Sequence, residues 1–290
     1  MQQFMEILLG GLSQGAVYCV IAVGLSLVYG AARILNFAHG SLYTIGGYIA
    51  WTMTSGYLGL PIWAAMLVAI PILFVLGVGL ERMIIRPMRA RENWKINTIM
   101  VTLGLAFALD NLSQIVFGPS AKTVAPFVDG TIELFGVTIS LYKFWMFWIA
   151  LALVAVLEFF LSATRFGHAV RAVSQDIQGA NQVGIEVNHV FAFTFGLSVV
   201  LTGLAGILLA PVFLVSPLGG WAPFLKAFVI VVFGGLGSTR GAFVAAFVLG
   251  LMESFIVFYL GAPWTMPIWL LMLLCVLMVR PKGLFGVWEN

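Results

Sequence analysis

Charged side chains are scarce in this sequence, and their scarcity indicates the class of protein. Only 9% of the 290 residues are charged, whereas 62% are hydrophobic. Several apolar stretches approach or exceed the roughly 20 residues that a helix needs to cross about 30 Å of hydrocarbon. We therefore expect an all-α fold, a polytopic transmembrane bundle of about eight or nine spans. The whole chain, residues 1–290, is expected to form a single transmembrane domain.

Cysteine and histidine are also scarce. The two cysteines, Cys19 and Cys275, both fall within apolar stretches, so the sequence predicts neither a disulfide framework nor a metal site. The three histidines, His39, His168 and His189, lack the spacing of metal ligands. A phosphate-binding loop of the form Gly-x-x-x-x-Gly-Lys-Ser/Thr is absent, and no pair of nucleophile and base is visible. We therefore expect no catalytic residues, no metal and no cofactor, and no enzyme activity in this chain.

The surplus of basic residues is small, with 14 Lys and Arg against 11 Asp and Glu. A surplus of this size, gathered in loops, indicates membrane orientation and contact with lipid, and it excludes nucleic acid as an expected partner. Residues 81–95 carry five basic and two acidic side chains, so the positive-inside rule predicts that this loop is cytoplasmic. The first apolar stretch follows no basic n-region and is expected to be a permanent span.

Seven stretches predict full transmembrane helices. Two further stretches, residues 40–54 and 223–237, have only about 15 residues each and are rich in glycine, so they are predicted to be short, broken or re-entrant. If both cross, the chain has about nine spans and an external N-terminus; if one is re-entrant, the N-terminus is cytoplasmic. Residues 118–140 are expected outside, with a small hairpin around Asp129-Gly130. The seven full spans are residues 6–29, 61–85, 98–117, 141–163, 190–215, 241–260 and 263–279.

Polar side chains within the apolar stretches are candidate functional residues. Asp110 and Asn111 lie in one predicted span, Lys226 lies in a short stretch, and Glu253 lies in the span after it. An isolated charge in hydrocarbon costs several kcal/mol, so we expect Lys226 to pair with Asp110 or, failing that, with Glu253. Such a pair either holds helices together or lines a translocation path, and the sequence leaves both interpretations open.

A polar group follows the first predicted span, where Asn36, His39 and Ser41 lie close together. The helix is expected to break here, and irregular backbone at membrane depth is tolerated only where protein or a water-filled cavity covers it. This group is either a gate or pore lining, or a polar turn at the membrane interface.

The longest polar segment of the chain is residues 165–189. Within it, residues 169–183 predict an amphipathic helix that ends at Gly184, where a left-handed C-cap forms easily. A membrane protein does not need such a helix in order to span a bilayer. We therefore expect this segment to dock onto a cytoplasmic partner.

Four motifs together carry a family resemblance. They are Leu-Asn-Phe-Ala-His-Gly-Ser at residues 35–41, Gly-His-Ala-Val-Arg-Ala-Val at residues 167–173 running to Val-Gly-Ile at 183–185, Gly-Gly-Leu-Gly-Ser at 234–238 followed by Gly241, and Pro-Lys-Gly-Leu-Phe at 281–285. In this order and spacing they resemble the LivH-type permease subunits of branched-chain amino acid ABC importers. The resemblance covers nearly the whole chain.

The resemblance implies a bacterial inner-membrane protein with several partners. These are two ATP-binding ATPase subunits, a second permease in a heterodimer or homodimer, and a periplasmic or lipid-anchored solute-binding protein. The segment at residues 165–189 resembles the coupling helix that enters a groove on the ATPase. By position, the coupling residues implied are Arg171, Ser174, Asp176, Gln178, Asn181 and Gly184.

The resemblance makes branched-chain amino acids the expected solute. Asp110 departs from the family pattern, because such permeases are expected to have Gln there, so urea, short amides and aromatic compounds stay open as solutes. A function of another class also stays open, an ion-coupled secondary transporter that uses Asp110, Glu253 or Lys226 as its coupling site.

Overall fold

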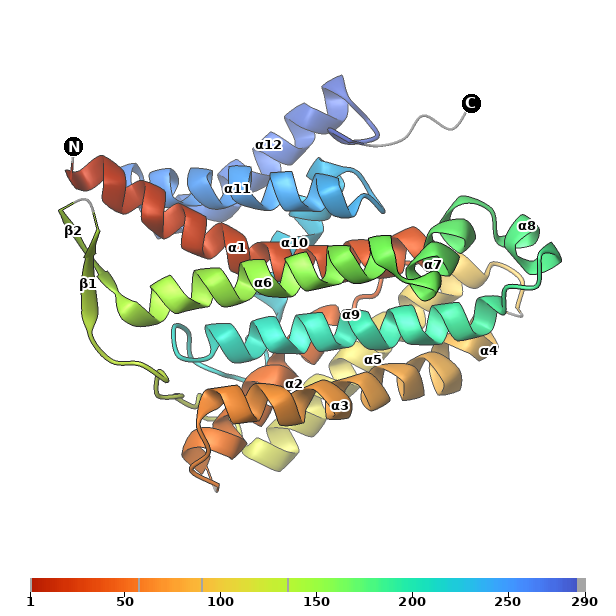
Figure 1. Ribbon diagram of the computed structural model, residues 1–290, viewed down its shortest axis with the longest axis horizontal. Coiled ribbons are helices and arrows are strands. Elements are labelled where there is room, and N and C mark those ends of the chain that lie inside the picture. The colour runs from red at the N-terminus through yellow and green to blue at the C-terminus, as the bar shows by residue number, and fades with distance from the viewer. Residues whose placement is uncertain (1, 57, 90, 135, 286–290) are drawn as a thin grey trace.

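The computed structural model describes residues 2–56, 58–89, 91–134 and 136–285. Its long helices run along one axis of the molecule (Figure 1). Seven of the described helices are long and apolar enough to cross a membrane, which confirms the predicted helical membrane bundle. The helices are α1 (Gln2–Ala32), α2 (His39–Trp51), α3 (Ile62–Leu80), α4 (Arg86–Arg89), α5 (Trp94–Phe117), α6 (Leu141–Ala163), α7 (Arg165–Gln175), α8 (Ile177–Gln182), α9 (Val187–Leu209), α10 (Trp221–Gly234), α11 (Thr239–Tyr259) and α12 (Thr265–Val279), with short turns η1 (Thr52–Gly56), η2 (Glu81–Ile85) and η3 (Ala262–Trp264).

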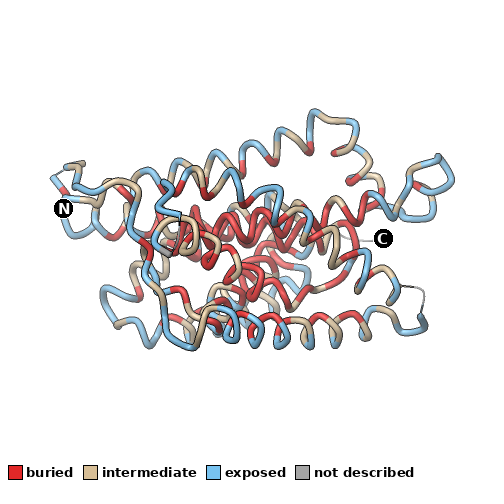
Figure 2. The backbone as a smooth tube through the Cα atoms, turned by 90° about the horizontal axis from the view of Figure 1, so that it is seen from below, coloured by how far each residue is buried: buried red, intermediate tan, exposed pale blue. Residues whose placement is uncertain are grey.

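The helices α1 and α9 form the centre of the bundle. Their most apolar segments are each 89% buried, whereas those of α3 and α6 are 28% buried. Figure 2 shows the buried residues concentrated along the middle of the molecule. A helix that is apolar on all sides is stable only inside protein or in lipid, so α1 and α9 form the protein core while α3 and α6 present apolar side chains on the outside of the bundle.

The short helix α2 starts inside the bundle. Residues 33–38 turn back from the end of α1 without forming a helix, and α2 begins only at His39. The Nε2 atom of His39 lies 3.1 Å from the carbonyl oxygen of Ile21, which is in the middle of α1. At its other end, Tyr48 stacks on Phe117, the last residue of α5. The helix therefore covers only one half of the bundle, and the non-helical segment covers the other.

The short helix α10 is the counterpart of α2 in the opposite half. It follows an irregular segment, residues 210–220, and begins beside the start of α2. A Cβ atom on Gly220 would lie 1.9 Å from the carbonyl oxygen of Gly40, so the two backbones are in contact where the helices begin. At 14 residues, α10 is about 21 Å long and is too short to span a membrane alone. Of the alternatives predicted for these two stretches, the structure shows short helices, each preceded by an irregular segment.

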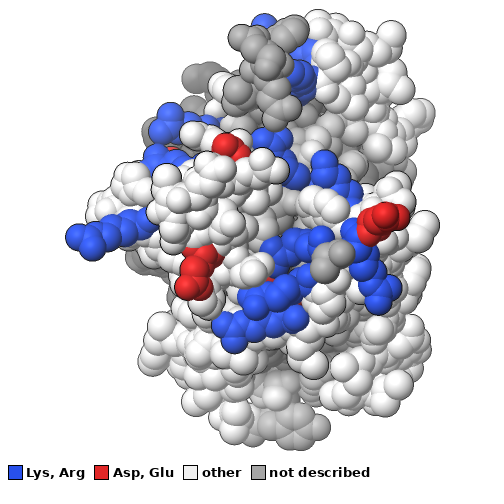
Figure 3. Space-filling model, turned by 90° about the vertical axis from the view of Figure 1, so that its right-hand side faces the viewer, with Lys and Arg blue, Asp and Glu red and all other residues white. Residues whose placement is uncertain are grey.

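The two ends of the bundle differ in charge. Helices α4, α7 and α8 lie at the right of Figure 1, and Figure 3 shows Lys and Arg gathered on this face; we call it the basic end. Within the described residues the chain passes between the two ends nine times, because residues 33–61 and 210–238 each cross through one short helix and one irregular segment. The start of α1 lies at the opposite end, in agreement with the nine-span prediction.

The predicted hairpin forms, but its turn was placed wrongly. Strands β1 (Thr131–Leu134) and β2 (Val137–Ser140) pair antiparallel, with Leu134 opposite Val137. Gly130 instead closes the base of the hairpin, where its carbonyl accepts a hydrogen bond from the Leu141 N–H at 3.0 Å. The positive φ that the tight turn needs is supplied by Gly136, at +78°.

The close approach of α2 and α9 generates a stability prediction. A Cβ atom on Gly46 of α2 would lie 2.1 Å from the carbonyl oxygen of Gly203, whereas a Cβ atom on Gly79 of α3 would meet nothing within 4 Å. We expect Gly46→Ala to force the helices apart and cost about 1–3 kcal/mol. Gly79→Ala should be neutral or slightly stabilising. Thermal unfolding of the purified proteins in detergent measures both, and equal melting temperatures would contradict the described packing.

Candidate functional site

Three residues from three helices form a polar cluster in the middle of the bundle. The ammonium nitrogen of Lys226 on α10 lies 2.6 Å from Glu253 Oε1 on α11 and 2.6 Å from the hydroxyl of Tyr18 on α1. The Tyr18 hydroxyl in turn donates to Glu253 Oε1 at 3.2 Å. The side chains of Lys226 and Glu253 are only 17% and 14% exposed. Their opposite charges therefore compensate each other away from bulk solvent.

Two aromatic rings lie near the ammonium group. Its nitrogen lies 4.8 Å from the ring centroid of Tyr18 and 5.6 Å from that of Trp269 on α12. The Trp269 ring lies at a distance at which an aromatic ring attracts a cation, whereas Tyr18 meets the ammonium through its hydroxyl. Lys226 thus contacts residues of α1, α11 and α12 at once and holds these helices around α10.

The preferred pairing of Lys226 with Asp110 was wrong, and the alternative with Glu253 is confirmed. Asp110 is buried and accepts a hydrogen bond from the Trp221 indole N–H at 2.9 Å. The error arises because α10 begins in the middle of the bundle, so its first residue, Trp221, lies level with Asp110. Lys226 lies more than one turn further along α10. The sequence does not identify Tyr18 as a member of this cluster, because nothing distinguishes it from the other residues of a long apolar helix.

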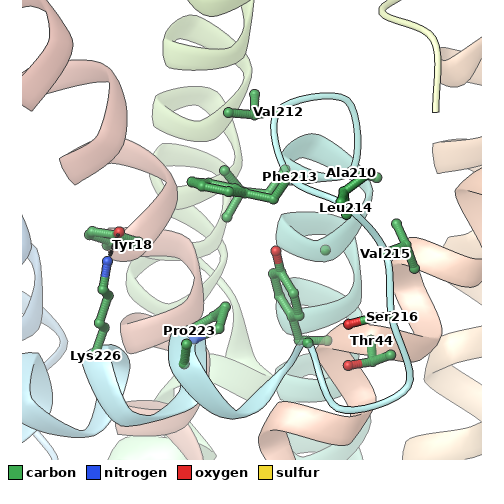
Figure 4. A pocket seen from close by; sticks show the side chains of 16 residues that line it. Tyr18, Thr44, Ala210, Val212, Phe213, Leu214, Val215, Ser216, Pro223 and Lys226 are labelled. Carbon is green, nitrogen blue, oxygen red and sulfur yellow. Dashed lines mark hydrogen bonds between the residues drawn. The ribbon is translucent and has the colours of Figure 1, made fainter. Parts of the chain in front are cut away.

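A cavity of about 460 Å³ opens beside this cluster. Lys226 and Tyr18 lie on one side of it, and Thr44, Val215 and Ser216 lie across from them (Figure 4). Most of the remaining wall is apolar and comes from α2, α9 and the segment that precedes α10. Within the described residues, no group of three or more His, Cys, Asp or Glu side chains is placed to hold a metal ion. The arrangement suits a small amphipathic molecule better than a metal ion.

The predicted gate residues lie in the protein interior, where they hold the broken segment in place. The Asn36 side-chain oxygen accepts a hydrogen bond from the Ala38 N–H at 3.1 Å, and Ser41 Oγ donates to the Ala106 carbonyl at 3.2 Å. His39 Nε2 lies 2.8 Å from Thr202 Oγ1 on α9. None of the three predicted residues lines the cavity beside Lys226. Their part in gating stays a prediction.

The next predicted path residue, Asn111, lies elsewhere in the structure. Its side chain is exposed on α5 and donates a hydrogen bond to the carbonyl of Phe107 one turn earlier, at 2.7 Å. Neither Asn111 nor its neighbour Asp110 lines the cavity beside Lys226. The candidates drawn from the sequence therefore occupy separate places in the bundle, and of the four candidates in the predicted spans the structure pairs Lys226 with Glu253.

The polar segment at the basic end consists of two helices, where one was predicted for residues 169–183. Helix α7 ends at Gln175, and Asp176 adopts an extended conformation with φ −148° and ψ 109°. The Asp176 carboxylate accepts a hydrogen bond from the Gln178 N–H at 2.9 Å and so caps α8. Asp competes for backbone hydrogen bonds at helix starts, which is why the chain breaks here. The expected stop is confirmed, since Gly184 has a φ of +85°.

Most of the implied coupling residues are accessible at the basic end. Ser174 is half-buried, and its carbonyl accepts a hydrogen bond from Arg33 Nη2 at 3.3 Å, which ties α7 to the segment between α1 and α2. Helix α8 also exposes apolar Ile177, and Val183 follows it with 76% of its surface exposed. The exposed coupling residues are Arg171, Asp176, Gln178, Asn181 and Gly184.

Comparison with known proteins gives matches over nearly the full length. The family model described as branched-chain amino acid transport system / permease component matches residues 7–279. The chain is 31% identical over 296 residues to the high-affinity branched-chain amino acid transport system permease protein BraD of Pseudomonas aeruginosa, covering 98% of this chain and 96% of that protein. It is 29% identical over 297 residues to LivH of Escherichia coli K12, with the same two coverages. No solved structure matches the chain.

The pairing of Lys226 leads to a prediction that distinguishes Glu253 from Asp110 as its partner. Lys226→Met leaves the Glu253 carboxylate buried without its cation, so we expect a loss of about 3–5 kcal/mol in the free energy of unfolding. Adding Glu253→Gln should restore part of that loss, whereas adding Asp110→Asn should not. Thermal unfolding of the purified single and double variants measures the difference. Rescue by Asp110→Asn alone would contradict the pairing described above.

Proposed function

Because this chain belongs to the branched-chain amino acid transport permease family, we propose that it is the permease subunit of an ABC importer that carries branched-chain amino acids across a bacterial inner membrane. The similarity to BraD and LivH extends along 98% of the chain, which supports this solute over urea, short amides and aromatic compounds. The nine passages through the bundle support a multi-pass membrane protein.

The polar segment α7–α8 is the single observation that carries the proposed mechanism. It lies outside the apolar bundle, at the end where basic side chains gather, and it presents polar side chains together with exposed Ile177 and Val183. By the positive-inside rule this end faces the cytoplasm. A mixed surface of polar side chains around apolar ones is typical of a protein interface. We assign it to the contact with an ATPase subunit.

In the proposed importer, ATP hydrolysis, solute capture and passage through the membrane are carried out by different chains. Membership of a permease family of ABC importers implies ATPase and solute-binding partners. We assign two ATP-binding subunits to the cytoplasmic side, a solute-binding protein to the opposite side, and a second permease beside this one. ATP binding and hydrolysis then shift the bundle between outward-open and inward-open packing through the contact at α7–α8.

The docking assignment predicts the effect of a charge at Val183. In the assembled importer, Val183→Arg should lower solute-stimulated ATP hydrolysis by about tenfold or more, because a buried unpaired charge weakens an interface strongly. Val279→Arg is the matched control, since Val279 is 81% exposed at the same end of the bundle but lies on α12. Its stimulated ATPase rate should be near that of the wild type. Equal rates in both well-expressed variants would contradict the assignment of α7–α8.

The orientation predicts which side of the membrane is labelled. In a background of Cys19→Ala and Cys275→Ser, Gln175→Cys should react with an impermeant maleimide only from the cytoplasmic side. Glu133→Cys on the exposed face of the hairpin should react only from outside. Labelling of right-side-out and inverted vesicles makes the measurement. Reaction of the residue 175 cysteine from the outside would reverse the proposed orientation.

A further inference from the structure

The geometry points to a binding subsite for the transported amino acid in the cavity beside Lys226, with the Lys226 ammonium receiving the α-carboxylate and the apolar wall receiving the aliphatic side chain. This inference rests on the proposed function and adds a place of solute recognition within this chain. It also gives Glu253 and Tyr18 a role as positioning residues, because they hold the ammonium at the cavity wall.

The cluster uses two of the three N–H donors of the Lys226 ammonium. A lysine ammonium carries three N–H donors. Two of them are directed to Glu253 Oε1 and the Tyr18 hydroxyl, each at 2.6 Å, and the same side chain lines the cavity. Within the part of the chain that the structure describes, the third N–H has no hydrogen-bond acceptor, so it is left for an occupant of the cavity. A carboxylate is the strongest acceptor for it, because hydrogen bonds between charged partners are about twice as strong as neutral ones.

The charge balance favours a zwitterion over a simple anion. The Lys226 and Glu253 side chains form a neutral pair. A net negative ligand would leave this poorly solvated site with an uncompensated charge, whereas an amino acid carries its own ammonium and keeps the total at zero. The first turn of α10 contributes Ala222 and Pro223 to the same cavity, so the positive end of the helix dipole also favours the carboxylate at this wall.

The remaining wall suits a branched aliphatic side chain. Tyr43, Leu209, Phe213 and Val215 line the cavity with apolar surface. Its volume of about 460 Å³ falls within the range of about 300–1,000 Å³ found for small-molecule sites. Burial of an aliphatic side chain against this surface is favourable, and glycine would gain nothing from it. The site therefore discriminates by side chain as well as by carboxylate.

Protection of a cysteine from labelling tests the subsite. Ser216 lines the cavity across from Lys226, so Ser216→Cys, in the Cys19→Ala and Cys275→Ser background, reports its occupancy. The probe is L-leucine, added to the assembled importer in detergent without the solute-binding protein, and the readout is the rate of maleimide labelling. Leucine should slow labelling. Leucinamide, which lacks the carboxylate, and glycine, which lacks the side chain, should do so only at concentrations about tenfold higher or more.

Variants at the cluster separate recognition from folding. Lys226→Met combined with Glu253→Gln removes both charges and so avoids a stranded carboxylate, and it should raise the leucine concentration for half-protection by about tenfold or more. Lys226→Arg with Glu253 retained should keep part of the protection, because the cation is preserved. Lys143→Met is the matched control, because Lys143 is exposed on α6 and does not line the cavity. It should leave half-protection unchanged.

Three results would overturn the subsite. They are unchanged labelling at saturating leucine, equal protection by leucine and leucinamide, and protection by octanoate without protection by leucine, which would indicate a site for an apolar acid. Leucine-stimulated ATP hydrolysis by the same wild-type complex with its solute-binding protein distinguishes the two proposals. If stimulation is present but protection is absent, the proposed function stands and the subsite fails. If stimulation is absent as well, the proposed function fails.

Discussion

The contact between Gly40 and Gly220 is the constraint on which the rest of the structure depends. With no side chain on either residue, the backbones at the starts of α2 and α10 touch in the middle of the bundle. Each helix therefore covers one half of the membrane, and each is joined to a non-helical segment that crosses the other half. Buried irregular backbone needs hydrogen-bond partners from the protein, and the Asn36 side chain and the Thr102 hydroxyl supply them to the N–H groups of Ala38 and Phe37.

This arrangement connects the cavity with the basic end. The segment at residues 33–38 leads into α2, which contributes Tyr43 and Thr44 to the cavity wall. The same segment contains Arg33, whose guanidinium donates to the Ser174 carbonyl near the end of α7. One short stretch of chain thus contacts the proposed ATPase-docking helices at one end and continues into the wall of the proposed solute site at the other. A connection of this kind could carry a movement at the cytoplasmic contact to the solute site.

The sequence predicted the class of fold well because apolar length is a strong signal. Each of the seven predicted spans overlaps one of the long apolar helices, and each glycine-rich stretch forms a short helix that follows an irregular segment. The pairing of Lys226 was harder to predict. The partner of Lys226 depends on the depth at which α10 begins, and α10 begins in mid-bundle because of the contact at Gly220, a long-range feature that no local pattern encodes. Asp176 carried a readable local signal, since Asp is a preferred N-cap, and a break between α7 and α8 was predictable from it.

ATP-dependent uptake into proteoliposomes tests the central claim most directly. The assembled importer is reconstituted with its solute-binding protein, and entry of radiolabelled leucine is followed with ATP on the ATPase side, or with a proton or sodium gradient and no ATP. The account predicts uptake that requires ATP and the solute-binding protein and does not respond to either gradient. Uptake driven by an ion gradient through this chain without ATPase subunits would contradict it and would favour an ion-coupled transporter.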